Sequence, residues 1–342
     1  MAQNYNIMDE QLFGEFSKGI ANGTYKSYNF YDLVDPTIHA YYNINKAFKF
    51  SSKPKKLPLK FFDIEVDADE SEFPEPSKAE YPVNAIAIYD NIDNELYSLI
   101  VPPANSDKNI NWQQEIETMY HQVVKENPKY EVPDIKIKVT SFKDDLSLLT
   151  RFYDIVNNSS SIALAGYNSG LFDIPYIFNR LKKLTPNWQT IASNYGQVKG
   201  FKNNFTVPDI IYVDMLYLYK PQSAGGAAMG KARVSYSLDY VSKSEIGIGK
   251  LEYEGNLVNL YKEDPVKFFV YNIFDTTLLH LLNEKLNHVN VLYGLSKFAG
   301  APMSKTLMGR SLLYQFNKTM SYWDNGTSVR SKLYNEEFIM FK

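Results

Sequence analysis

The sequence predicts an α/β protein, because segments patterned like β-strands alternate with segments patterned like helices. Residues Lys60–Val66 are rich in aromatic and β-branched residues, and Val83–Tyr89 and Glu95–Val101 flank a polar turn like two strands of a meander. The short, uniformly apolar segment Ile162–Ala165 is typical of a strand in a sheet that is covered on both sides. We therefore expect a sheet with helices packed on its faces.

Composition restricts the class of protein. The 342 residues suffice for one large domain with appendages or for two modest domains. The net charge of −3 excludes a strongly basic protein that coats nucleic acid, although local basic patches are compatible with it. The absence of cysteine excludes disulfides, thiolate metal sites and cysteine nucleophiles. With no signal-peptide pattern at the N-terminus and no apolar run approaching ~20 residues, we expect a soluble, cytoplasmic protein.

Two acidic residues on the first strand are the first candidate site. Alternation along a strand puts Asp63 and Glu65 on one face, and Phe62, Ile64 and Val66 on the other. Two adjacent carboxylates are either a solvated pair, which is common, or ligands for a divalent cation such as Mg²⁺ or Mn²⁺.

A second candidate follows the apolar strand. The glycine-containing turn Gly166–Asp173 leads into a helix over 174–184, in which Pro175 is tolerated because the first turn needs no backbone donor. Asp173 is therefore expected at a helix N-terminus just beyond a strand, where an ordinary N-cap is the alternative interpretation.

A third candidate lies on a long helix that begins at Asp264–Pro265 and ends near Leu286. Asp264 is the predicted cap and Pro265 the first helical residue. Tyr271 and Asp275 are four residues apart and share a face, and an aspartate in such an apolar helix is either solvated at an edge or met by a cation. The predicted buried stripe comprises Phe269, Ile273, Leu278, Leu282 and Leu286.

The remaining segments complete the expected order. Helices are predicted over 112–125 and over 145–156, the latter with Leu146, Leu149, Phe152 and Val156 buried. Residues 196–213 are expected to form a hairpin or an irregular strand pair, and 215–219 a short helical turn. Gly225–Lys231 matches G-x-x-x-x-G-K, but Ala232 replaces the Ser or Thr that a P-loop needs, so we reject a nucleotide-binding loop.

Taken together, these three weak signals resemble the exonuclease motifs of the DnaQ-like 3′–5′ exonucleases, which have a ribonuclease-H-like fold. The order is Asp-x-Glu on a strand (Phe62–Val66), Asn-x₄-Asp at a strand-to-helix turn (Asn168–Asp173) and Tyr-x₃-Asp on a late helix (Tyr271–Asp275). The sequence is similar in particular to the proofreading domain of family B DNA polymerases of T-even-like bacteriophages, and the loop Phe73–Pro76 adds to that similarity. The resemblance covers roughly residues 58–318.

The resemblance implies a mixed β-sheet flanked by helices and a role for each motif residue. Tyr271 would orient the attacking water, whereas Asn168 and Phe172 would contact the terminal nucleotide. Asp214 also matches an aspartate of the family, and we expect it to have at most a supporting role. Four acids would bind two divalent cations, Mg²⁺ or Mn²⁺: Asp63, Glu65, Asp173 and Asp275.

The same resemblance suggests how the chain is organised. We expect an N-terminal appendage (1–57), an exonuclease domain (58–290) and a C-terminal helical extension (291–342) that packs on the N-terminal region. Polymerase motifs are absent from this sequence. The expected function is metal-dependent 3′–5′ hydrolysis of single-stranded DNA 3′ ends or frayed primer termini, as the proofreading part of a split or truncated polymerase with a separate polymerase subunit as partner. The alternatives are a free-standing exonuclease that trims DNA or RNA ends, and a non-catalytic module that binds single-stranded DNA or a polymerase.

Overall fold

The structure is a computed structural model, and it divides the chain into two compact units. The residues that it describes are 57–68, 73–126, 135–159, 161, 163–201, 204–208, 210–220, 232–253, 255–299 and 303. Nearly all of them belong to the unit formed by residues 52–294 and 303–310. Three features of the sequence analysis therefore lie wholly or mostly outside the described residues: the appendage 1–57, the extension 291–342 and the segment Gly225–Lys231.

A six-stranded mixed sheet forms the centre of this unit, in the order β4-β3-β2-β1-β5-β8. Strand β1 pairs antiparallel with β2 and parallel with β5, and β5 pairs parallel with β8. On the other side, β3 is antiparallel to β2 and parallel to β4. The strands are β1 (Leu59–Val66), β2 (Val83–Asp90), β3 (Glu95–Ile100), β4 (Lys136–Ser141), β5 (Ala163–Gly166) and β8 (Tyr212–Asp214).

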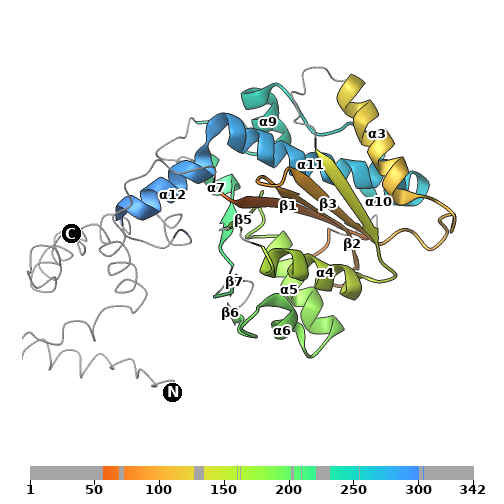
Figure 1. Cartoon of the computed structure of the whole chain (residues 1–342), viewed down its shortest axis with the longest axis horizontal. Coiled ribbons are helices and arrows are strands. Elements are labelled where there is room, and N and C mark those ends of the chain that lie inside the picture. The colour runs from red at the N-terminus through yellow and green to blue at the C-terminus, as the bar shows by residue number, and fades with distance from the viewer. Residues whose placement is uncertain are drawn as a thin grey trace, which may run out of the picture. The chain divides into compact units, whose positions relative to one another are not determined.

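Helices cover both faces of the sheet, as Figure 1 shows. On one face lie α3 (Trp112–Glu126) and α11 (Pro265–Leu286), and their core includes Phe61 and Phe269. On the other face lie α4 (Asp145–Asn157) and α5 (Asp173–Leu184), and their core includes Phe62. The mixed α/β architecture with a helix-flanked sheet is confirmed.

Shorter elements complete the described part of the chain. A two-stranded hairpin, β6–β7, precedes β8 and confirms the hairpin expected within 196–213. These elements are α6 (Trp188–Ala192), β6 (Lys199–Phe201), β7 (Asn204–Thr206), α7 (Leu216–Tyr219), α9 (Leu238–Ile246), α10 (Leu257–Glu263) and α12 (His288–Ala299). Among the residues that the structure describes, no helix has the length and apolar character needed to span a bilayer.

Strand β1 has the two faces that its alternation predicts. Phe62 and Ile64 are buried in the core beneath α4 and α5. Asp63 faces the opposite way, since its Oδ2 accepts a hydrogen bond from Asn272 Nδ2 of α11 at 3.0 Å. The pairing register of β1 and β2 shifts between Glu65 and Val66, an irregularity of the kind that often ends pairing beside a functional site.

Helix α11 begins where the sequence predicts, but its burial is different. Asp264 caps it by accepting a hydrogen bond from the Lys267 backbone N–H at 3.0 Å. The expectation of a single buried stripe is wrong, because residues 268–283 are buried all around the helix except Leu281. The reason is that α11 packs against the sheet and also against α3, α9 and α10.

Helix α4 shows a smaller departure. Leu149, Phe152 and Val156 are buried as expected, but Leu146 is only half-buried, and Leu148 and Tyr153 take its place in the core. The buried stripe is therefore shifted around the helix relative to the predicted one.

Candidate active site

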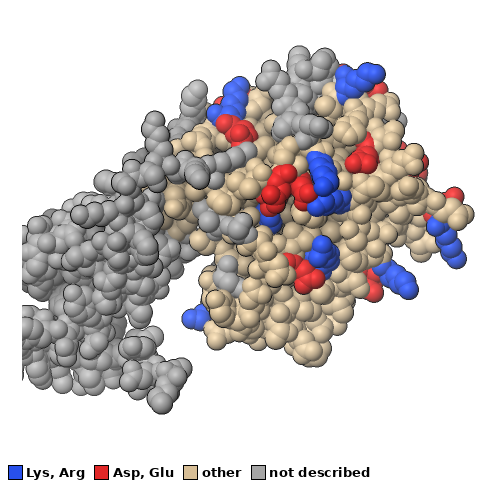
Figure 2. Space-filling view, viewed as in Figure 1, with Lys and Arg blue, Asp and Glu red and all other residues tan. Residues whose placement is uncertain are grey.

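One cavity of about 590 Å³ gathers the predicted site residues. Its walls come from β1, from the turn that follows β5, from the start of α5, from α11, from Lys250 and residues 256–258, and from the loop residues Phe73 and Pro74. Figure 2 shows acidic and basic side chains interspersed over the described part of the face in view, without a broad field of one sign. All seven predicted residues line the cavity: Asp63, Glu65, Asn168, Phe172, Asp173, Tyr271 and Asp275.

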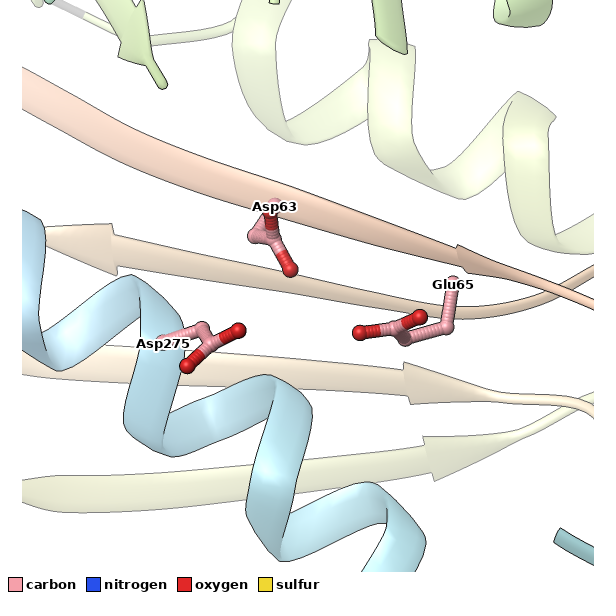
Figure 3. Close-up of side chains that lie close together, drawn as sticks. All are labelled: Asp63, Glu65 and Asp275. Atoms are coloured by element: carbon pink, nitrogen blue, oxygen red, sulfur yellow. The ribbon is translucent and has the colours of Figure 1, made fainter. Parts of the chain in front are cut away.

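Three carboxylates converge in this cavity from two elements. Asp63 and Glu65 come from β1 and Asp275 comes from α11, and Figure 3 shows their carboxylates pointing toward one another. One ligand oxygen from each lies within 4.8 Å of the others. The first and third sequence motifs, 212 residues apart from Asp63 to Asp275, therefore form one acidic cluster.

Asp173 approaches the cluster from the end of β5. Strand β5 pairs with β1 only from Leu59 to Phe61, so beyond Phe61 that edge of β1 is free to be approached by the turn after β5. Asp173 is the first residue of α5, and Phe172 is the N-cap, so the ordinary N-cap interpretation of Asp173 is wrong. Asp173 is buried and is close enough to Asp63 for its charge to raise the pKa of Asp63. It is not one of the three acids grouped within 4.8 Å in the described part of the chain.

The acids of the cavity are harder to ionise than acids in water. Withdrawal from water raises the pKa of Glu65 to about 8, and the charges of Asp275 and Asp173 add to this effect. Withdrawal from water likewise raises the pKa of Asp173 to about 7. The pKa values of Asp63 and Asp275 are also raised, first by burial and, for Asp63, also by the neighbouring carboxylates. A cation in the cavity would relieve this repulsion.

Lys250 is a site residue to which the sequence analysis assigned no role. Its Nζ donates to Asp275 Oδ2 at 2.5 Å and to the Tyr271 hydroxyl at 3.1 Å. Burial lowers the pKa of Lys250, but the neighbouring carboxylates of Asp275 and Asp63 outweigh burial and the pKa is raised, so Lys250 carries its charge. The expected cationic partner for Asp275 is therefore present within the chain itself.

The position of Lys250 depends on close packing with α9. The Lys250 backbone N–H donates to Asp239 Oδ1 at 2.9 Å. A Cβ on Gly249 would lie 2.6 Å from that same oxygen and 2.2 Å from Lys243 Cε, so a side chain there would displace both Asp239 and Lys243. The Gly-Lys dipeptide is the only signal in the sequence that could have pointed to this residue.

An apolar rim adjoins the carboxylates. Phe172 lines the cavity, and its ring centroid lies 5.6 Å from that of Phe73. Phe73 also lines the cavity and is 83% exposed. Phenylalanine side chains are usually buried, so this exposure is unusual. Asn168 lies beside them with a φ of +60°, in the left-handed region. Phe73 belongs to the loop Phe73–Pro76, which was not predicted to be part of the site.

The residues present fit a divalent cation. Asp275 is 1% exposed, and its Oδ1 is buried without a hydrogen-bond partner. A buried, unpaired carboxylate oxygen beside two further carboxylates is the donor set that hard cations such as Mg²⁺ and Mn²⁺ prefer. Asp63, Glu65 and Asp275 are the residues that would hold the ion.

Comparison with known proteins identifies the family. The model of the exonuclease domain of DNA polymerase family B matches residues 21–241, which is more than half of the chain. The match begins inside the predicted appendage and ends before Tyr271. The chain therefore belongs to the family of exonuclease domains of family B DNA polymerases, and this membership implies a 3′–5′ exonuclease.

Individual relatives agree with this assignment. The DNA-directed DNA polymerase of Escherichia phage RB69 is 30% identical over 256 residues, which cover 71% of this chain and 27% of that polymerase. The DNA-directed DNA polymerase of Enterobacteria phage T4 is 24% identical over 251 residues, with the same two coverages. DNA polymerase 1 of Aeropyrum pernix is 24% identical over 282 residues, which cover 81% of this chain and 26% of that protein. The chain thus spans about a quarter of the length of the curated relatives it matches.

Proposed function

We propose that this chain is a divalent-metal-dependent 3′–5′ exodeoxyribonuclease that serves as the proofreading part of a phage-type family B DNA polymerase. The observation that carries the proposal is the convergence of Asp63, Glu65 and Asp275 within 4.8 Å in a cavity that an apolar rim adjoins. Membership in the exonuclease family supports the direction of hydrolysis.

The acidic residues and Tyr271 would have different roles in this reaction. Asp63, Glu65 and Asp275 would hold one Mg²⁺ or Mn²⁺, and Asp173, at the wall of the same cavity, would complete the set for a second ion. Two such ions supply an activated water and stabilise the departing 3′ oxygen. Tyr271 lines this cavity, and its hydroxyl would orient the attacking water, as a positioned group lowers the entropic part of the barrier.

The substrate side of the cavity favours an unpaired nucleotide. The rings of Phe172 and Phe73 offer an apolar surface on which the terminal base would pack. Asn168 adds a hydrogen-bonding amide at the same wall. A base held between this rim and the carboxylates has left its duplex, so single-stranded DNA 3′ ends and frayed primer termini are the substrates that the cavity suits.

Two alternative hypotheses about the function differ from this proposal. A free-standing exonuclease would have the same chemistry and would act on DNA or RNA ends without a polymerase partner. A retired module that only binds single-stranded DNA or a polymerase would be expected to have lost metal ligands, whereas all four acids are present here.

The test is hydrolysis of an oligonucleotide labelled at either end. With Mg²⁺ or Mn²⁺, we expect a 5′-labelled strand to shorten one nucleotide at a time and a 3′-labelled strand to release its label as the mononucleotide. EDTA and the double variant Asp63→Ala/Glu65→Ala should each abolish both signals, because both remove the metal site. Degradation by the folded double variant in EDTA would show that the metal assignment is wrong.

A further inference from the structure

The turn that carries the nucleotide-facing residues is held from behind by a buried carboxylate. We propose that Asp214 is a positioning residue that fixes the turn 166–173, so that Asn168 and Phe172 face the cavity with Asp173. This inference rests on the proposed function, since it assigns those residues to the substrate. In this proposal Asp214 neither binds the metal nor lines the cavity; its role is to hold the backbone of the turn.

The turn needs an external hold because its backbone is not relaxed. Asn168 has a φ of +60°, a region that non-glycine residues adopt at an energetic cost. Gly166, where the turn begins, allows no side chain, since a Cβ would lie 2.6 Å from Ser169 Cβ and 2.8 Å from Phe62 Cε1. The turn is therefore compact, and two of its backbone N–H groups, those of Asn168 and Gly170, donate to an acceptor outside the turn.

The acceptor of these N–H groups is the carboxylate of Asp214. The Asn168 N–H donates to its Oδ1 at 2.8 Å, and the Gly170 N–H donates to its Oδ2 at 3.1 Å. The Leu216 N–H, at the start of α7, also donates to Oδ1 at 3.0 Å. Successive backbone N–H groups in a turn form a concave anion-binding surface, and here an internal carboxylate fills it.

The fold brings this carboxylate to the turn by register. Strand β8 pairs in parallel with β5 so that Asp214 is opposite Gly166, the last residue of β5. Both strands therefore end at the same edge of the sheet, where the turn begins. Gly170 allows the approach, because a Cβ there would lie 3.2 Å from Asp214 Oδ2, tighter than most side chains tolerate.

These contacts also separate Asp214 from the metal ligands. Both of its oxygens are engaged by backbone donors, and it is not among the residues that line the cavity. It acts through the backbone of Asn168 and Gly170. Charge-assisted hydrogen bonds to backbone N–H groups are strong, so one carboxylate can hold the whole turn.

Replacement of this carboxylate should loosen the turn while leaving the cluster of Asp63, Glu65 and Asp275 in place. In Asp214→Asn the amide keeps one acceptor oxygen and presents an NH₂ group to a backbone donor. We expect the KM for a single-stranded oligonucleotide to rise about tenfold, because the nucleotide-facing residues lose their fixed position. Calorimetric titration should show the Mn²⁺ ion held by Asp63, Glu65 and Asp275 bound within about twofold of its wild-type affinity, because these residues come from β1 and α11. A second ion that uses Asp173, which lies at the end of the turn, should bind more weakly.

A second variant disturbs the same contact from the other side. Gly170→Ala keeps every charge but crowds Asp214 Oδ2, so it should shift KM in the same direction and less. The double variant Asp214→Asn/Gly170→Ala should be no worse than Asp214→Asn alone, since both changes break one interaction. The matched control is Ile137→Ala on β4, a buried residue at the far edge of the sheet, which should lower the melting temperature and leave KM unchanged.

Amide hydrogen exchange makes the test independent of catalysis. In Asp214→Asn, well below its melting temperature, peptides covering 166–173 should exchange faster while those from β1 and α11 stay protected. An unchanged KM with unchanged exchange would overturn the proposal, as would a KM shift that Ile137→Ala reproduces. If the wild-type chain hydrolyses no DNA, the proposed function fails, and exchange at 166–173 still decides whether Asp214 holds the turn.

Discussion

Two side chains in the cavity, those of Asp275 and Tyr271, contact the ammonium group of Lys250. Lys250 Nζ contacts both Asp275 and the Tyr271 hydroxyl, so the lysine ties the phenol and the carboxylate of α11 to residues 249–252. Tyr271 is 5% exposed, which is low enough that its ring is held by packing and its hydroxyl by this contact. The proposed function gives the two residues different roles: Tyr271 would position the attacking water, and Asp275 would supply ligand charge to the metal.

Tyr271→Phe should slow hydrolysis by about 10- to 1,000-fold while leaving metal affinity nearly unchanged. The substitution removes one hydroxyl and keeps the ring, so the packing of α11 survives. Single-turnover rates at saturating Mn²⁺ and calorimetric metal titration measure the two effects separately. Asp275→Ala is the paired control and should lose both rate and metal affinity. A full rate in Tyr271→Phe would reduce Tyr271 to a core tyrosine at helical spacing.

Charge repulsion in the cavity should make the metal-free protein less stable than it could be. Burial and neighbouring charges raise the pKa of Glu65 from 4.5 to about 8. Because this acid is harder to ionise in the folded state, its contribution to stability is fully present below pH ~4.5 and is lost as pH rises through about 8. In EDTA at pH 8, Glu65→Gln should therefore melt higher than wild type, by about 2–4 °C for each kcal/mol of relieved repulsion.

Added Mn²⁺ should reverse the ranking of the two melting temperatures, so that the wild type melts higher than Glu65→Gln. It should raise the melting temperature of the wild type and have a smaller effect on Glu65→Gln, which lacks one ligand charge. Differential scanning fluorimetry at pH 5 and pH 8, with EDTA or with Mn²⁺, checks both statements. A lower melting temperature for Glu65→Gln in EDTA at pH 8 would contradict them.

At the scale of elements, the two edges of the sheet have different tasks. Edge strand β8 delivers Asp214 to the turn, whereas edge strand β4 lies at the far side and exposes Lys136. On β4, two lysines meet the Glu95 carboxylate of β3: Lys138 Nζ at 2.5 Å and Lys136 Nζ at 3.3 Å. Lysines on an edge strand also discourage pairing with another chain.

The Glu95 cluster predicts acid sensitivity of this edge. Hydrogen bonds from Lys138 and Tyr97 lower the pKa of Glu95 from 4.5 to about 2. The stabilisation is therefore present above pH ~4.5 and is lost as pH falls toward 2. Because Lys136 is exposed and Lys138 partly exposed, salt screens both charges, and we expect Glu95→Gln to cost only about 1 kcal/mol at pH 7. Urea unfolding at pH 7 and pH 2.5 tests this, and an equal gap between variant and wild type at both pH values would contradict it.

Local patterns were enough to predict β1 and the start of α11. Alternation in Lys60–Val66 predicted which side of the strand is apolar, and the Asp264–Pro265 pair marked the helix start, because both signals act within a few residues. Burial around α11 was not predictable in the same way. It depends on α3, α9 and α10 closing around the helix, and their placement is set by tertiary packing.

At the scale of the whole molecule, the three motifs predicted the cavity but not all of its walls. Lys250 contacts Asp275 across 25 residues of chain, and Asp214 contacts Asn168 across 46. Neither spacing carries a helical or strand period, so only the folded structure brings these pairs together. Strand β4 was missed for a related reason, since Ile137 alone is buried among its six residues and the alternating signal is weak.

The cavity as a whole predicts which DNA ends are hydrolysed fastest. A terminal nucleotide must leave its duplex to lie between the Phe172–Phe73 rim and the three carboxylates, and unpairing is least costly at a mismatch or on a single strand. We therefore expect the rate to fall in the order single strand, mismatched primer terminus, matched blunt duplex, with a difference of at least about tenfold between the extremes. Single-turnover hydrolysis of a hairpin with a matched or a mismatched 3′ pair, compared with a single strand of equal length, measures this order at fixed salt, since DNA binding depends on ionic strength.

Phe73→Ala should lower the rate on single strands while leaving metal activation unchanged, because the ring lies on the rim and not among the acids. Equal rates on all three substrates would mean that the terminal nucleotide does not enter this cavity unpaired.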